Sequence, residues 1–88
     1  MQYEIIAVTP HGERKLLDRR HDRPSYAHFD LVKPGEPVRV IAPNLASAKQ
    51  YRDDFLAWNN DRTPDGLGFD VSRVVLRKYV PPQTEVVP

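Results

Sequence analysis

The amino-acid sequence predicts an α+β fold, in which a small, mostly antiparallel sheet of four to five strands is covered on one face by a single amphipathic helix. Short segments of alternating polar and apolar residues recur between turn residues, a pattern typical of strands. One longer stretch repeats apolar residues every three or four positions, which is typical of a helix. The chain has 88 residues, too few for two independent hydrophobic cores. The expected order is strand, strand, strand, strand, helix, strand.

The first expected strand covers residues 3–8. Its apolar side chains fall on both faces, with Ile5 on one side and Ile6 on the other, which indicates an interior strand. Residues 9–12 supply turn chemistry, and Gly12 ends the turn. A second strand over Arg14–Arg19 is expected to return beside the first. Its many charges favour an edge position, where charged side chains discourage pairing between sheets.

A second hairpin is expected around residues 33–36. Residues 26–32 alternate between apolar and polar side chains, the pattern of a half-buried strand. Pro34 fixes φ at the second position of a turn, and Gly35 accepts the positive φ of the third position in a type II turn. Residues 37–42 are therefore predicted to run back as the partner of the preceding strand.

The helix is predicted to begin after Asn44, a favoured N-cap because its side-chain oxygen can accept hydrogen bonds from the free amides of the first turn. One apolar stripe with helical spacing follows, and we expect it to face the sheet. It consists of Leu45, Ala48, Tyr51, Phe55 and Trp58. Asn59 and Asn60 are expected to end the helix, before a loop rich in glycine and proline.

The last expected strand covers residues 69–80, with Phe69 and Val71 on the same face as Arg73 and Arg77. A run of apolar residues on both faces favours an interior position beside the first strand. Two prolines then follow, and proline cannot donate to a sheet. We therefore predict one domain over residues 1–80 and a loose C-terminal tail over residues 81–88.

The composition limits the cellular compartments and the kinds of chemistry that are compatible with the chain. The chain has no cysteine, which excludes disulfides, thiolate metal sites and a cysteine nucleophile. Its N-terminus lacks the basic start and apolar run of a signal peptide. No segment approaches the roughly 18 apolar residues of a membrane helix. We expect a cytoplasmic protein that does not enter a membrane.

No pattern indicates catalysis. The spacing of His11, His21 and His28 matches no metal-ligand motif. The simpler interpretation is that these histidines lie on the protein surface. There is no glycine-rich phosphate loop and no glycine-flanked serine. We therefore predict a protein that is not an enzyme, with no catalytic residue, cofactor-binding residue or metal ligand.

Thirteen basic and twelve acidic residues give a net charge of +1. Proteins that chiefly neutralise phosphates usually have a clear basic excess. One basic cluster is nevertheless a candidate for contact with RNA or DNA, although three acidic residues interleave with it. It consists of Arg14, Lys15, Arg19, Arg20 and Arg23.

A second group of residues is expected on the sheet face that the single helix leaves uncovered. Arginine and tyrosine are enriched at the energetic centres of protein interfaces. The candidate partner-binding residues are Arg73, Arg77, Tyr79 and Arg39.

We therefore predict a small protein-binding module that acts by occupying a partner's surface. Our hypothesis for its role is that of a phage or mobile-element inhibitor of a host or defence complex. The alternative is an accessory protein that binds RNA or DNA through the basic cluster of residues 14–23 and the arginines of the sheet. The sequence leaves the oligomeric state open.

Overall fold

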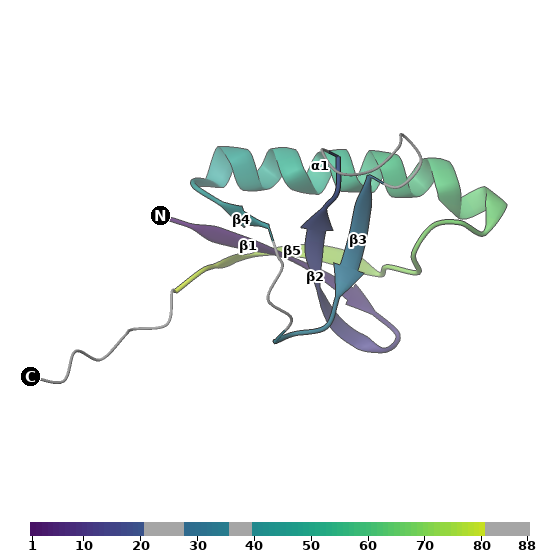
Figure 1. Cartoon of the computed structure of the whole chain (residues 1–88), viewed down its shortest axis with the longest axis horizontal. Coiled ribbons are helices and arrows are strands. Elements are labelled where there is room, and N and C mark those ends of the chain that lie inside the picture. Colours follow the sequence, from purple (N-terminus) through teal and green to yellow (C-terminus); the bar gives the residue numbers. More distant parts are fainter. Residues whose placement is uncertain (21–27, 36–39, 81–88) are drawn as a thin grey trace, which may run out of the picture.

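The computed structural model describes residues 1–20, 28–35 and 40–80. In this part of the chain it shows a small antiparallel sheet and a single α-helix, which confirms the predicted α+β class. Figure 1 shows the helix lying across one face of the sheet. The elements are β1 (Tyr3–Thr9), β2 (Gly12–Asp18), β3 (Phe29–Val32), β4 (Ile41–Ala42), α1 (Leu45–Arg62), a 3₁₀ turn (Thr63–Asp65) and β5 (Arg73–Lys78).

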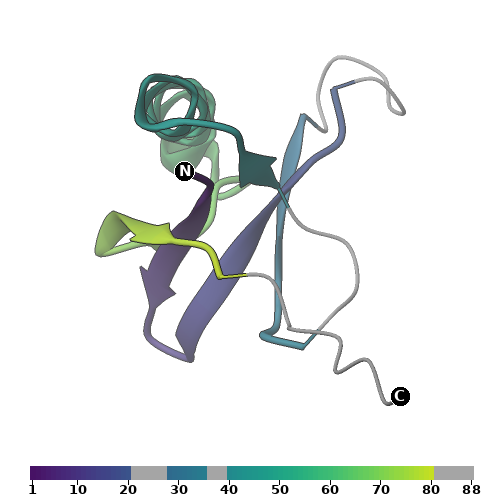
Figure 2. The same ribbon diagram turned by 90° about the vertical axis from the view of Figure 1, so that its left-hand side faces the viewer.

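The first strand, β1, lies at the centre of the sheet. The strand β5 pairs with it from Tyr3 to Val8, and β2 and β4 pair with its other side, all of them antiparallel. The strand β3 pairs with the outer side of β2. Figure 2, which views α1 along its axis, shows β3 and β5 on opposite flanks of the sheet. The predictions that the first strand is interior and that the last strand lies beside it are confirmed.

The second strand was expected at an edge, and that prediction is wrong. In the structure β2 pairs with β1 on one side and with β3 on the other. Leu16 and Leu17 are both buried. Lys15, one of the charges that suggested an edge, is neutralised inside the sheet by an ion pair with Glu4 of the neighbouring strand.

The expected hairpin around residues 33–36 is also only partly correct. Gly35 has the predicted positive φ, 95°. However, β3 and β4 are not partners in the described sheet, since β3 pairs with β2 and β4 with β1. Beyond Lys15 the strand β2 leaves β1, and β4 takes the vacated place beside Tyr3 and Glu4. The predicted beginnings of these two strands, residues 26–27 and 37–39, lie outside the described residues.

The helix begins as predicted. The side-chain oxygen of Asn44 accepts a hydrogen bond of 2.8 Å from the amide of Ser47. Ala48 and Phe55 are fully buried, and Tyr51 and Trp58 pack against the same core. That core also contains sheet residues, chiefly Ile5, Leu16 and Phe29. Leu45 does not belong to it, because 42% of its surface is exposed.

The helix does not end at Asn59 and Asn60 but continues to Arg62. Asparagine ends helices when its side chain competes for the local backbone. Here Asn59 is buried, and its amide group bonds instead to the distant backbone of Phe69. The helix therefore continues, and the hydroxyl of Thr63 donates to the Asn59 carbonyl oxygen at its end, at 2.8 Å.

The last strand is shorter than predicted and is paired on one side. In the described part of the chain, β1 is the only partner of β5. The amide of Ser72 donates to the carbonyl oxygen of Val8, the residue that also lies opposite Arg73. Ser72 and Arg73 therefore both lie opposite Val8. This arrangement is a β-bulge, and it shifts the alternation of side chains along the strand by one residue. Phe69 and Val71 consequently pack against the core and do not share the face of Arg73 as expected.

Candidate functional site

Within the described residues, the backbone groups on the outer edge of β5 have no strand partner. Tyr79, opposite Gln2, donates its amide to the Gln2 carbonyl oxygen at 2.8 Å. In an antiparallel pair, the backbone groups of alternate residues point to the neighbouring strand, and those between them point away. Given the register in which Lys78 lies opposite Tyr3, the outward residues are Val74, Leu76 and Lys78. Sequence reasoning missed this edge because it placed the strand in the interior.

The side chains of this edge are predominantly basic. Arg73, Arg77 and Lys78 are all exposed. Arg77 forms an ion pair of 2.7 Å with Glu13, in which both side chains are about half exposed. Within the described residues, neither Arg73 nor Lys78 forms an ion pair. Tyr79, just beyond the strand, is half-buried. Three of the four candidate partner-binding residues therefore lie together on or beside β5, and the fourth, Arg39, lies outside the described residues.

The sheet face opposite α1 is not uniformly open, contrary to the expectation. Ile6 points to this face and is only 1% exposed. Glu4 and Leu17, on the same face, are also buried. The ion pair between Glu4 and Lys15 lies among these residues, with the two side chains 9% and 15% exposed. The exposed side chains of this face therefore lie toward its margins, and at the β5 margin they are Arg73 and Arg77.

The basic cluster predicted to contact nucleic acid is divided by the structure. Lys15 is held by Glu4, and Arg19 lies 3.4 Å from Asp30. Arg14 makes a hydrogen bond to the Glu13 carbonyl oxygen and points toward the hairpin turn. Arg23 lies outside the described residues. The described members do not form one continuous positive surface.

Arg20 is the most constrained member of the cluster. Its guanidinium forms ion pairs with Asp18 at 2.8 Å and Asp54 at 2.9 Å. It also lies 5.0 Å from the ring centre of Phe29 and 5.7 Å from that of Tyr51. The hydrogen bonds that Arg20 donates to the Asp18 carboxylate raise the pKa of Arg20 above its already high ordinary value, and the bond to Asp54 adds to this effect. The side chain thus links the end of β2 to α1.

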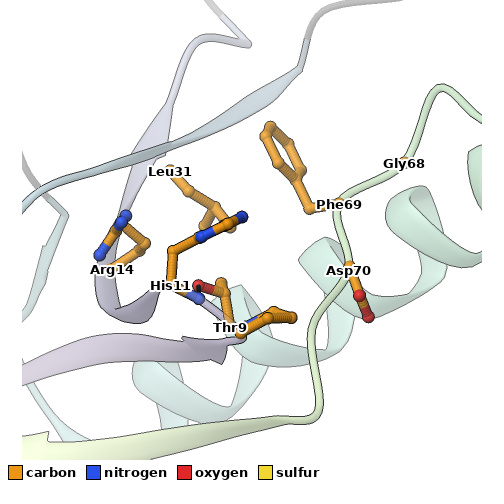
Figure 3. A pocket seen from close by; sticks show the side chains of 8 residues that line it. Thr9, His11, Arg14, Leu31, Gly68, Phe69 and Asp70 are labelled. Carbon is orange, nitrogen blue, oxygen red and sulfur yellow. Dashed lines mark hydrogen bonds between the residues drawn. The ribbon is translucent and has the colours of Figure 1, made fainter.

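A shallow hollow of about 380 Å³ lies between the β1–β2 turn and the segment that precedes β5 (Figure 3). Its lining consists of Thr9, Pro10, His11, Arg14, Leu31, Gly68, Phe69 and Asp70. The cationic Arg14 and the anionic Asp70 come from opposite sides of it, so the hollow has no strong preference for one charge. Among the described residues, no three histidine, aspartate or glutamate side chains are arranged to hold a metal ion. Sequence analysis did not identify this hollow, because it joins residues about 60 positions apart that share no local pattern.

Comparison with known proteins finds no family model, no curated protein and no solved structure that matches the chain. The helix of the described residues does not combine the length and the apolar character that crossing a bilayer requires.

Proposed function

We propose that this protein is a binding module that contacts another protein through β5, with Arg73, Arg77 and Tyr79 at the interface. The observation that carries the proposal is that β5 is paired on one side only in the described sheet. An edge strand with unpaired backbone groups is a template for association, and many peptide-binding domains use one. The protein would act by occupying its partner's surface, and inhibition of a host or defence complex by a phage or mobile-element protein is our hypothesis for its role.

The charge distribution favours a protein partner over nucleic acid. A phosphate-binding surface needs cations that are free to replace counterions. In this chain Lys15, Arg19 and Arg20 are already paired with carboxylates, and the net charge is only +1. Recruiting Lys15 or Arg20 to phosphates would require breaking ion pairs that connect neighbouring elements, whereas the partly exposed pair of Arg19 with Asp30 is weak.

Affinity capture with the tagged chain, with and without nuclease, tests the proposal. We expect a protein to be retained after nuclease treatment and lost with the double variant Arg73→Ala/Arg77→Ala. The matched control is Arg52→Ala, which removes an arginine that forms an ion pair with its neighbour Asp53. It should retain the partner, because it lies on α1 away from β5.

Nucleic-acid binding is tested directly with labelled RNA and duplex DNA. Tight binding at physiological salt, abolished in Arg19→Ala/Arg20→Ala/Arg23→Ala, would contradict the proposal and support the alternative. Affinity would then also fall steeply with salt, because bound phosphates release counterions. Circular dichroism must accompany this variant, since Arg20 links β2 to α1.

A further inference from the structure

We propose that the partner contributes an extended segment of alternating acidic and apolar residues, which adds to the sheet as a strand along the outer edge of β5. This inference rests on the proposed function and names the chemistry of the partner at the same surface. It follows from the backbone groups of β5, from the side chains beside them and from the charge of the edge.

The backbone groups on the outer edge of β5 can pair best with an extended chain. Val74, Leu76 and Lys78 present their amides and carbonyl oxygens outward at every second residue, as the register with β1 requires. Only another strand repeats donors and acceptors with this spacing, because a helix satisfies its backbone groups internally. A strand paired here would satisfy groups that have no partner in the described structure.

The side chains select acidic residues on one face of the added strand. Arg73, Val75 and Arg77 share the face opposite α1, since they lie across from Val8, Ile6 and Glu4. Directly opposite residues on paired strands contact each other, and opposite charges there are favourable. Carboxylates facing Arg73 and Arg77 would therefore be attracted. The exposed ion pair of Arg77 with Glu13 is no obstacle, because exposed pairs are weak and exchange readily.

The other face selects apolar residues. Val74 and Leu76 point toward α1, are only partly buried and pack against the core. Apolar side chains opposite them on an added strand would extend that core past the present edge of the sheet. The preferred segment therefore alternates acidic and apolar residues, with the acidic ones on the face of Arg73 and Arg77.

A second copy of this chain fits the edge poorly. Two β5 strands side by side would bring the basic side chains of both copies together, namely Arg73, Arg77 and Lys78 from each. Like charges on paired strands are destabilising, and basic residues on edge strands prevent such self-association. An acidic segment from a different protein meets no such repulsion.

Amide hydrogen exchange of the full chain, followed by NMR, tests this inference. The probe is a synthetic peptide of alternating glutamate and valine with blocked ends. At a peptide concentration of about ten times Kd, exchange should slow about tenfold at Val74, Leu76 and Lys78, because it then proceeds from the unbound protein, about one molecule in eleven. The amides of Val75 and Arg77, which already point to β1, should change little.

Two control peptides separate backbone pairing from charge. A peptide of alternating lysine and valine tests the charge, and a glutamate–valine peptide with alternate amides N-methylated keeps the charge but removes donors. We expect neither to protect the three edge amides. Reversing the charge with Arg73→Glu/Arg77→Glu should transfer binding from the glutamate peptide to the lysine peptide, whereas Arg52→Glu should not.

Absence of protection by the glutamate peptide, or equal protection by either control peptide, would overturn the inference. So would protection that grows with protein concentration alone, because it would assign the edge to a second copy. If capture of a protein still depends on Arg73 and Arg77 in that event, the proposed function stands without this inference. If that capture also fails, both are wrong.

Discussion

Asn59 shows how a single polar residue determines the path of the chain after the helix. Its side-chain amide donates to the Phe69 carbonyl oxygen at 3.0 Å and accepts from the Phe69 amide at 2.7 Å. These two bonds hold the segment that leads into β5 against the last turns of α1. The sequence pattern identified Asn59 as a helix-ending residue, because its bonding partner ten residues away is not visible in local spacing.

Replacing Asn59 by alanine should therefore destabilise the protein. The substitution leaves a partly buried amide and carbonyl of Phe69 without their partner, and each such loss costs about 1–3 kcal/mol. We expect the free energy of unfolding to fall by roughly 2 kcal/mol or more in urea denaturation. The matched control is Asn60→Ala, which alters an exposed neighbour and should change stability by less than about 0.5 kcal/mol. Equal effects of the two substitutions would show that the bonds to Phe69 contribute nothing.

At the scale of elements, the sequence correctly predicted the features of the helix that depend on residues close together in the chain. The N-cap at Asn44 and the buried stripe at Ala48 and Phe55 depend on neighbours within one or two turns, and both predictions are confirmed. The interior position of β2 depends on Glu4 neutralising Lys15 from another strand. Charge alone therefore indicated an edge, since the sequence does not show which charges are paired.

The ion pair between β1 and β2 can be tested by Lys15→Met, which keeps the aliphatic chain and removes the charge. Glu4 would then stay buried without this cation, and breaking a buried pair in this way costs about 3 kcal/mol or more. The control is Arg19→Met, because the pair of Arg19 with Asp30 is partly exposed and such pairs contribute about 0–1 kcal/mol. Thermal and urea unfolding should show a much larger loss for Lys15→Met. A loss no larger than that of Arg19→Met would mean that Lys15 is free for another role.

At the scale of the whole molecule, the sequence indicated which side chains of the candidate site are exposed, but not where in the sheet they lie. Alternation along the last strand placed Arg73 and Arg77 on one face, and both are exposed there. The open edge beside them was missed, because strand order depends on contacts far apart in sequence. The bulge at Ser72 was missed for a related reason, since it is defined by a hydrogen bond to Val8. The spacing of apolar side chains along a strand does not show which backbone groups of distant strands are hydrogen-bonded.

The extent of the folding unit is the last expectation to test, by removing residues 81–88. The hydrophobic cluster of the described structure runs from Tyr3 to Leu76, and Tyr79 donates its amide to Gln2, the residue before β1. A chain ending at Val80 keeps all of these groups. We therefore expect its Tm to change by less than about 3 °C, since that corresponds to well under 1 kcal/mol for a domain of this size. A control chain ending at Val75, which loses Leu76 and part of the pairing with β1, should be strongly destabilised. Marked destabilisation of the chain ending at Val80 would show that the domain extends beyond it.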